Sequence, residues 1–219
     1  SLKTFQKEHN LTIFHLMGQH VNYKQRYRTK QARFWASSYE DKRPELTNAQ
    51  RKMLSHYDNA TLYNDSIVAQ IVKRFQKQDA IVIYVPDHGE ECYEENRGFI
   101  CRNHSAEIDW PLAHYEFEIP FWIYCSPKYI RNHRDIYRQI RKAKDKRFMT
   151  DALPHLLLYL AGIETPTYKE EYNILSPKYD EMRPRILKNS ADYDKLRDAH
   201  LEKIKKEESK KVKKKERRN

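Results

Sequence analysis

The sequence lacks an apolar run long enough to cross a membrane. A membrane-spanning helix needs roughly 18–20 consecutive apolar residues, and the longest candidate, Leu156 to Ala161, is far shorter. Glycine is also scarce, at 4 of 219 residues, whereas 16 tyrosines are present. This composition is unlike that of low-complexity or disordered chains, so we expect one large domain, or one and a half small ones, with a proper core.

Cysteine occurs only three times, at Cys92, Cys101 and Cys125. No two of them form a Cys-x-x-Cys pair, so the sequence does not indicate a structural zinc knuckle. Cys92 and Cys101 flank a segment short enough for a disulfide to close it. Because bond geometry rather than spacing decides whether a disulfide forms, the sequence leaves this pairing open.

Positive charge is unevenly distributed along the chain. The formal net charge is +11, and residues 201–219 contain ten Lys and Arg against four Glu. We therefore expect a basic helical tail at 189–219, distinct from a domain at 1–188. Such a tail either binds anionic lipid headgroups or nucleic acid, or is a solvated terminal helix. No aromatic residue lies among its cations, so base stacking is not indicated and we expect no nucleic-acid partner.

Hydrophobic patterning predicts an α/β fold with a largely parallel sheet flanked by helices, and a charged C-terminal helix. A buried strand over 11–17, a long helix over 48–77 and a strand over 80–85 together predict a βαβ unit. A long loop over 89–117 and a third strand over 119–125 follow. The remaining predicted elements are a basic helix over 133–145, a helix capped by Thr150–Asp151 and closed by Gly162, turns over 163–188, and a charged helix over 189–216.

The most informative motif is Asp87-His88-Gly89, directly after the strand predicted over 80–85. Ligands bind at the carboxyl ends of strands in open α/β sheets, and Asp oxygen and His nitrogen are ordinary zinc ligands. The strand predicted over 11–17 leads to His20, and His104 lies in the long loop. If the two strands are parallel neighbours, these side chains converge on one or two zinc ions, or on a metal beside a phosphate. The alternative is a turn that merely ends a strand.

Several segments resemble, in order, motifs of the phosphoethanolamine transferases of the alkaline phosphatase/sulfatase superfamily. His15 to His20 resembles the family's His-x-x-Gly-x-His segment, and Tyr57 to Asp65 resembles its Tyr-x-Asn-x-hydrophobic-x-x-x-Asp helix. Tyr84 to Glu90 is similar to its Tyr-x-Ser-Asp-His-Gly-Glu motif, with Pro86 in place of the Ser. Glu118 to Ile123 resembles the strand that follows that motif.

The resemblance implies roles for the predicted site residues. Asp87 and His88 would be ligands of the catalytic zinc, while His20 and His104 would contact the phosphoryl group of the substrate or a second zinc. The family's threonine nucleophile and a glutamate ligand lie on segments before the one that matches His15 to His20, and no threonine here has a matching context. We therefore expect residues 1–188 to be the carboxyl-terminal portion of the catalytic domain. Because an incomplete ligand set holds zinc poorly, we predict that these residues alone bind it weakly or not at all and have no transfer activity.

For the whole enzyme, the resemblance implies transfer of phosphoethanolamine from phosphatidylethanolamine to a lipid A, lipopolysaccharide or glycan acceptor. It also implies an enzyme of the bacterial inner membrane, anchored by segments missing here, with its catalytic domain facing the periplasm. One alternative is a sulfatase or phosphodiesterase of the same superfamily. The other is a non-catalytic module that binds anionic surfaces through residues 201–219. Its binding would persist in the Asp87→Ala and His88→Ala variants and would depend steeply on salt concentration.

Overall fold

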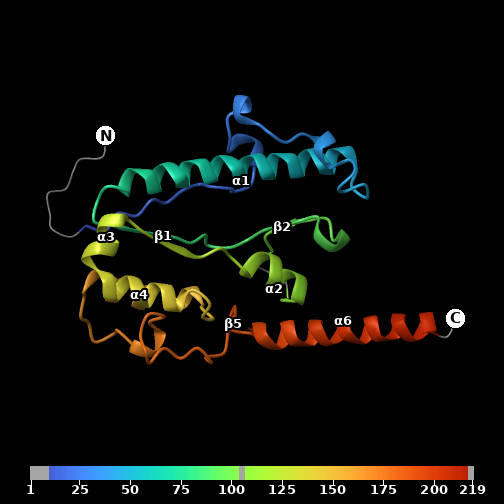
Figure 1. Cartoon of the computed structure of the whole chain (residues 1–219). Helices are drawn as coiled ribbons and strands as arrows, with labels where there is room; N and C mark the ends of the chain where they lie inside the picture. Colours follow the sequence, from blue (N-terminus) through green and yellow to red (C-terminus); the bar gives the residue numbers. More distant parts are fainter. Residues whose placement is uncertain (1–9, 104–106, 217–219) are drawn as a thin grey trace. The chain divides into compact units, whose positions relative to one another are not determined.

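The computed structural model describes residues 10–103 and 107–216 (Figure 1). The chain divides into two compact units, each built from separate segments. Unit 1 comprises residues 1–82, 124–144 and 151–179, and unit 2 comprises residues 83–123, 145–150 and 180–219. These two units differ from the predicted domains, residues 1–188 and 189–219. The predicted domain division stays a prediction.

The long helix predicted over 48–77 is confirmed as α1, Asn48–Phe75, in unit 1. A capping box begins it, because the Thr47 hydroxyl accepts a hydrogen bond from the Gln50 N–H at 3.3 Å and the Gln50 side chain accepts one from the Thr47 N–H at 2.7 Å. These bonds satisfy two N–H groups that have no partner within the helix. Three short 3-10 turns precede α1, at Tyr23–Gln25, Thr29–Gln31 and Ala36–Tyr39.

Asn59 fastens the preceding loop to α1. Its side chain is buried, and its Oδ1 accepts hydrogen bonds from the backbone N–H groups of Arg33 at 2.7 Å and Phe34 at 3.1 Å. Its Nδ2 donates to the carbonyl oxygens of Phe34 at 2.8 Å and Ser55 at 2.7 Å. All four hydrogen-bonding positions of the amide are therefore filled. Asn59 belongs to the helix motif quoted above, and in this chain it has a structural role.

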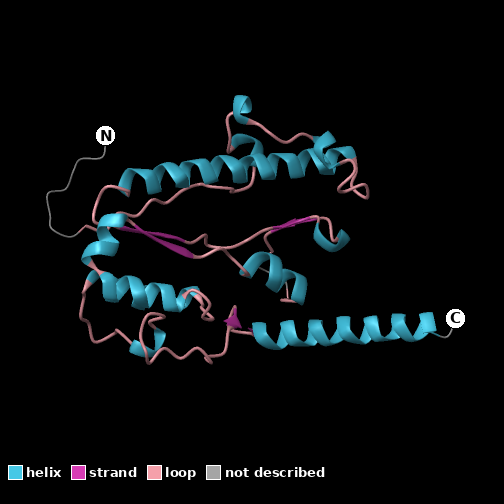
Figure 2. Cartoon of the chain, viewed as in Figure 1, coloured by secondary structure: helices cyan, strands magenta, loops and turns pink. Residues whose placement is uncertain are grey.

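Two predicted strands form a two-stranded sheet (Figure 2). They are β1, Ile81–Tyr84, and β4, Trp122–Cys125, which is shorter than predicted. Near one end the Ser126 N–H donates to the Ala80 carbonyl oxygen at 3.0 Å. At the other end the last residue of β1 stacks on the first residue of β4, with ring centroids 5.2 Å apart. This order of contacts is that of an antiparallel pair.

The prediction of a strand over 11–17 is wrong. These residues have no strand structure, and their side chains are all exposed, with Leu11 at 74% and Ile13 at 80%. A strand is stable only when its backbone N–H and C=O groups pair with a neighbour, and no strand of the described ranges pairs with this segment. The predicted βαβ unit is therefore not formed. The strands in these ranges make three two-stranded sheets, so a largely parallel sheet is not confirmed.

The loop predicted over 89–117 contains regular structure in unit 2. Strand β2, Glu91–Cys92, pairs antiparallel with β3, Phe99–Cys101. Helix α2, Trp110–Phe117, follows, and the Asp109 side chain caps it by accepting from the Leu112 N–H at 3.0 Å. Strands of two or three residues and a helix of eight are too short to produce a recognisable periodic pattern. Cys92, Cys101 and Cys125 are present as thiols.

The predicted charged C-terminal helix is confirmed as α6, Tyr193–Glu216. It begins later than residue 189 because Ala191–Asp192 forms β6, which pairs antiparallel with β5, Ile186–Leu187. The first turns of α6 contribute to the core of unit 2, whereas residues 201–212 are all exposed. Residues in that core are Ile108, Leu112, Ala113, Leu187 and Tyr193.

The remaining helices belong to unit 1. They are α3, Pro127–Asn132, α4, Arg134–Ala143, and α5, Leu153–Ala161, which ends at Gly162 in the left-handed conformation (φ 66°) as predicted. The cap predicted at Thr150–Asp151 is wrong, because Thr150–Ala152 forms a 3-10 turn and no side chain caps α5. None of the helices in the described ranges has the length and apolarity that a bilayer span requires.

Candidate metal centre

Asp87 and His88 lie in the connection between β1 and β2, in unit 2. The Asp87 side chain is 87% exposed, whereas that of His88 is 19% exposed. Asp87 Oδ2 lies 3.7 Å from His88 Nε2, and Asp87 Oδ1 accepts a hydrogen bond from the His88 N–H at 3.1 Å. The structure therefore brings a carboxylate and an imidazole nitrogen close together at the end of β1.

Both ring nitrogens of His88 have a hydrogen-bonding neighbour. His88 Nδ1 lies 2.7 Å from the Gly89 carbonyl oxygen, which can only accept, so Nδ1 carries the proton and donates. Arg102 Nη1 lies 3.0 Å from His88 Nε2, and a guanidinium can only donate, so Nε2 is the acceptor. These contacts fit the tautomer with its proton on Nδ1, in which Nε2 presents an electron pair. This is a form in which histidine binds metal ions.

The pair fits zinc in donor type and in separation. Two ligands at the usual ~2.0–2.1 Å from a tetrahedral zinc lie about 3.3 Å apart, which is close to the 3.7 Å between Asp87 Oδ2 and His88 Nε2. Arg102 Nη1 lies 3.0 Å from the same nitrogen, so zinc at Nε2 would replace this hydrogen bond. Within residues 10–103 and 107–216, no group of three His, Cys, Asp or Glu side chains could hold a metal. The described ranges therefore contain a pair of candidate ligands, Asp87 and His88, and no larger cluster.

Gly89 brings the backbone of this turn against α2. The Gly89 N–H donates to the Glu116 carbonyl oxygen at 2.7 Å, and a Cβ at Gly89 would lie 2.2 Å from the Tyr115 carbonyl oxygen. Only glycine permits such a close approach. The buried Glu116 side chain also accepts a hydrogen bond from the Asn103 N–H at 2.7 Å. Both the turn with the two ligands and the segment after β3 are therefore fastened to α2.

An ion network holds the β2–β3 hairpin beside α2. The Glu91 side chain is fully buried, and Arg97 Nε lies 2.7 Å from its Oε1. Burial raises the pKa of the Glu91 carboxyl, although the positive charge of Arg97 opposes this effect. Arg97 also pairs with Asp109, the residue that caps α2. The hairpin that follows the candidate ligands is therefore tied electrostatically to the start of α2.

The comparisons with known proteins show the family of the chain. The family profile described as Sulfatase matches residues 2–163. The chain belongs to the sulfatase family. The phosphoethanolamine transferase EptC of Escherichia coli (strain K12) is 32% identical over 190 residues, which cover 82% of this chain and 31% of the relative. The Kdo(2)-lipid A phosphoethanolamine 7''-transferase of the same strain is 31% identical over 141 residues, which cover 63% of this chain and 23% of the relative. The predicted resemblance to phosphoethanolamine transferases is therefore confirmed.

Solved structures are similar to this sulfatase-family chain over about half their length. The C-terminal periplasmic domain of EcEptC from Escherichia coli matches with a TM-score of 0.66 and 28% identity, over 83% of this chain and 51% of that domain. The same domain in complex with Zn matches with a TM-score of 0.64 and 28% identity, over 82% of this chain and 50% of that domain. The similarity supports an α/β fold of the sulfatase type for this chain.

The other two predicted site residues, His104 and His20, are not part of unit 2 as the structure describes it. His104 lies outside the described residues. His20 belongs to unit 1, where its Nδ1 lies 3.0 Å from the Val21 carbonyl oxygen and its own carbonyl oxygen accepts from Arg26 Nε at 2.8 Å. The convergence of all four side chains therefore stays a prediction.

Sequence reasoning missed two residues that contact the candidate ligands or the segments beside them, Arg102 and Glu116. Arg102 follows β3 in a segment with no pattern that would distinguish it from the chain's many other cations. Glu116 did have a signal, because it is the only acidic residue within α2 and is flanked by aromatic residues. A lone acid on such a helix indicates a buried carboxylate with specific hydrogen-bond partners.

Proposed function

We propose that this chain is the carboxyl-terminal part of the catalytic domain of a zinc-dependent phosphoethanolamine transferase. The Asp87–His88 pair carries the proposal, since it offers a carboxylate oxygen and an imidazole electron pair 3.7 Å apart. The relatives named as phosphoethanolamine transferases and the Zn complex of the EcEptC domain support it. The donor would be phosphatidylethanolamine and the acceptor a lipid A, lipopolysaccharide or glycan. The catalytic domain would face the periplasm from the inner membrane.

Asp87 Oδ2 and His88 Nε2 would hold the zinc together with ligands from outside the described residues. When bound, zinc lowers the pKa of a hydroxyl nucleophile and neutralises charge on a transferring phosphoryl group. The contact of His88 Nδ1 with the Gly89 carbonyl oxygen would orient the ring so that Nε2 faces the metal, and Arg102 would leave Nε2 when the metal binds.

Arg102 would supply positive charge for the substrate. Its guanidinium lies 3.0 Å from His88 Nε2, so it would move off this nitrogen when zinc binds, and it could then form hydrogen bonds with oxygen atoms of a phosphoryl group. Such charge stabilises the negative equatorial oxygens that phosphoryl transfer develops. His20 and His104 are proposed to contact the same phosphoryl group or a second zinc.

The experiment is an assay of the full-length protein in membranes with labelled phosphatidylethanolamine and a lipid A acceptor. Because metal catalysis supplies several kcal/mol of transition-state stabilisation, Asp87→Ala and His88→Ala should each lower the transfer rate by at least about 100-fold. His133→Ala serves as the matched control, since His133 pairs with Asp79 in unit 1. Release of free sulfate, or release of the label to water without transfer, would contradict the proposal and favour a sulfatase or phosphodiesterase.

A further inference from the structure

The second half of α6 carries many lysines that have no role in the proposed function. The helix is anchored near its start, where Trp110 of α2 stacks on His200 with ring centroids 5.2 Å apart and Leu196 packs against the core of unit 2. From residue 201 to residue 212 every side chain is exposed. Residues 201–212 therefore expose their side chains to solvent, while the start of the same helix is packed against unit 2.

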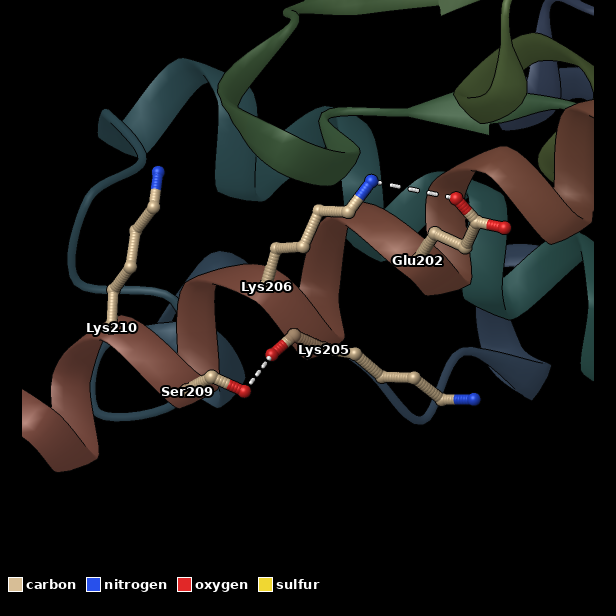
Figure 3. Close-up of a pocket in the computed structure, with 5 residues that line it drawn as sticks. All are labelled: Glu202, Lys205, Lys206, Ser209 and Lys210. Atoms are coloured by element: carbon tan, nitrogen blue, oxygen red, sulfur yellow. Dashed lines mark hydrogen bonds and ion pairs between the residues drawn. The ribbon is translucent and has the colours of Figure 1, made fainter.

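Lysines form a row along this exposed part of α6. Lys203, Lys206 and Lys210 follow one another at intervals of three and four residues, and Lys213 continues the spacing in the sequence. This spacing keeps residues on one side of a helix. At 1.5 Å per residue, the row from Lys203 to Lys210 is about 10 Å long. Figure 3 shows Lys206 and Lys210 extending from one side of α6 and Lys205 from another. We call Lys203, Lys206 and Lys210 the lysine ridge.

The ridge borders an open hollow rather than an enclosed pocket. The hollow is lined by Glu202, Lys205, Lys206, Ser209 and Lys210, which all belong to α6 (Figure 3). Sites for small molecules are usually concave and enclose most of the ligand's surface, which a single helix cannot do. Lys206 Nζ lies 3.5 Å from Glu202 Oε2, but both side chains are about 70% exposed, so this pair neutralises the ridge only weakly. The surface suits an extended anionic partner.

We propose that the lysine ridge docks this domain on the anionic headgroups of a lipid bilayer. The choice of a bilayer rests on the proposed function, whose substrates are membrane lipids. A basic helix is attracted to an anionic bilayer by each lysine that comes near its surface. An anionic surface would also relieve the repulsion between like charges three and four residues apart on the helix. The packing of the start of α6 against α2 holds the lysine ridge in place for this contact.

Two other modes of binding are disfavoured by the same helix. Residues 201–219 contain no aromatic side chain, so nothing in this stretch can stack on nucleic-acid bases. Leu201, Ile204 and Val212 are exposed, but Glu208 follows Ile204 and precedes Val212 at four-residue spacing and so interrupts the apolar strip. An interrupted strip cannot bury a continuous apolar face among acyl chains. Contact with headgroups through the ridge is therefore the mode that the sequence and exposure favour.

Sedimentation of the chain with vesicles tests the proposal. We expect binding to vesicles of phosphatidylcholine with phosphatidylglycerol and none to phosphatidylcholine alone. Each lysine near an anionic surface changes the affinity about fivefold, so Lys206→Gln with Lys210→Gln should lower it roughly 20- to 30-fold. The matched control is Lys205→Gln with Lys211→Gln, which removes the same charge from other sides of α6 and should lower it only a few-fold. Circular dichroism of both variants checks that α6 is retained.

Each other outcome would overturn the proposal. Equal loss in the two double variants would mean general charge attraction without a ridge, and no loss in either would mean that α6 does not bind. Binding that persists at 0.5 M salt would indicate insertion, because exposed charges are screened at that ionic strength. Tighter binding to single-stranded nucleic acid than to the anionic vesicles would also exclude a membrane role.

The vesicle result and the transfer result can fail separately. Vesicle binding requires neither zinc nor the donor lipid, so Asp87→Ala should bind vesicles like the wild type while losing transfer. If transfer is confirmed and the ridge variants bind normally, only the docking proposal fails. If the ridge binds vesicles and the full-length protein releases sulfate instead of transferring phosphoethanolamine, only the proposed function fails.

Discussion

At the scale of single residues, the two candidate ligands could be predicted from the sequence. The residues that hydrogen-bond to them could not. Asp87 and His88 follow an apolar, β-branched run, and that position alone indicated a metal-ligand pair at a strand end. The ring orientation of His88 depends on the Gly89 carbonyl oxygen and on Arg102, which lies fourteen residues away in the sequence. No sequence pattern specifies a contact of that kind, because it depends on how the hairpin after the turn folds back.

Gly89→Ala tests how tightly the ligand-bearing turn is fastened to α2. The new Cβ would lie 2.2 Å from the Tyr115 carbonyl oxygen, so backbone must move and the Gly89–Glu116 hydrogen bond must weaken. Overpacking of this kind typically costs about 1–3 kcal/mol, and we expect a lower Tm in thermal unfolding followed by circular dichroism. Gly162→Asn is the control, since Gly162 adopts a left-handed conformation that Asn tolerates, with open space around it. An unchanged Tm for Gly89→Ala would show that this close approach does not exist.

At the scale of elements, the two longest helices were predictable from their periodicity. Helix α1 and helix α6 have 28 and 24 residues, and both were predicted from the sequence. The β2–β3 hairpin and α2 were missed because their elements have two to eight residues, too few for periodicity to distinguish them from a loop. The segment over 11–17 has the composition of a strand, but composition cannot supply the neighbour that a strand needs.

The anchoring of α6 depends on Asp194, which is surrounded by three arginines. Asp194 Oδ1 lies 2.6 Å from Arg185 Nη2 and 3.2 Å from Arg197 Nη1, and Arg147 pairs with Oδ2. The hydrogen bonds from Arg185 lower the pKa of the Asp194 carboxyl, and the charges of all three arginines add to this effect against the opposing effect of burial. The ionised carboxylate is therefore the form that stabilises the start of α6.

This shift predicts the direction of a pH effect on stability. Because the folded-state pKa of Asp194 lies below the unfolded value of about 3.9, its contribution is present above about pH 5 and is lost as the pH falls through the folded-state pKa. Asp194→Asn should cost about 2 kcal/mol at pH 7 and should show a smaller loss of stability between pH 5 and pH 3 than the wild type. Urea unfolding at each pH measures both quantities.

A matched substitution separates this effect from a general response to lost charge. Asp135→Asn removes an acid whose side chain is 85% exposed and pairs with Arg138 on the surface. It should change the free energy of unfolding at pH 7 by no more than about 0.5 kcal/mol. Equal effects of the two substitutions would contradict an anchoring role for Asp194.

At the scale of the whole molecule, the chain spans about half of the solved EcEptC domain and less than a third of the EptC relative's length. Sequence motifs were sufficient to predict the family, because they occur in a defined order over most of the chain. They were not sufficient to predict the sheet, since the described strands pair only in twos. At the candidate metal centre, the structure places Asp87 beside His88, and the convergence with His20 and His104 stays a prediction.

Zinc affinity shows whether Asp87 and His88 bind the metal. Loss of an outer-shell partner typically weakens metal binding about 10- to 100-fold, so loss of a true ligand should cost more than that. In titrations with a competing fluorescent chelator, we predict that Asp87→Ala and His88→Ala each weaken zinc binding by the full-length protein more than about 100-fold, whereas His133→Ala leaves it unchanged. The 219-residue chain alone should bind zinc only weakly. Wild-type zinc affinity in the Asp87→Ala and His88→Ala variants would contradict the account.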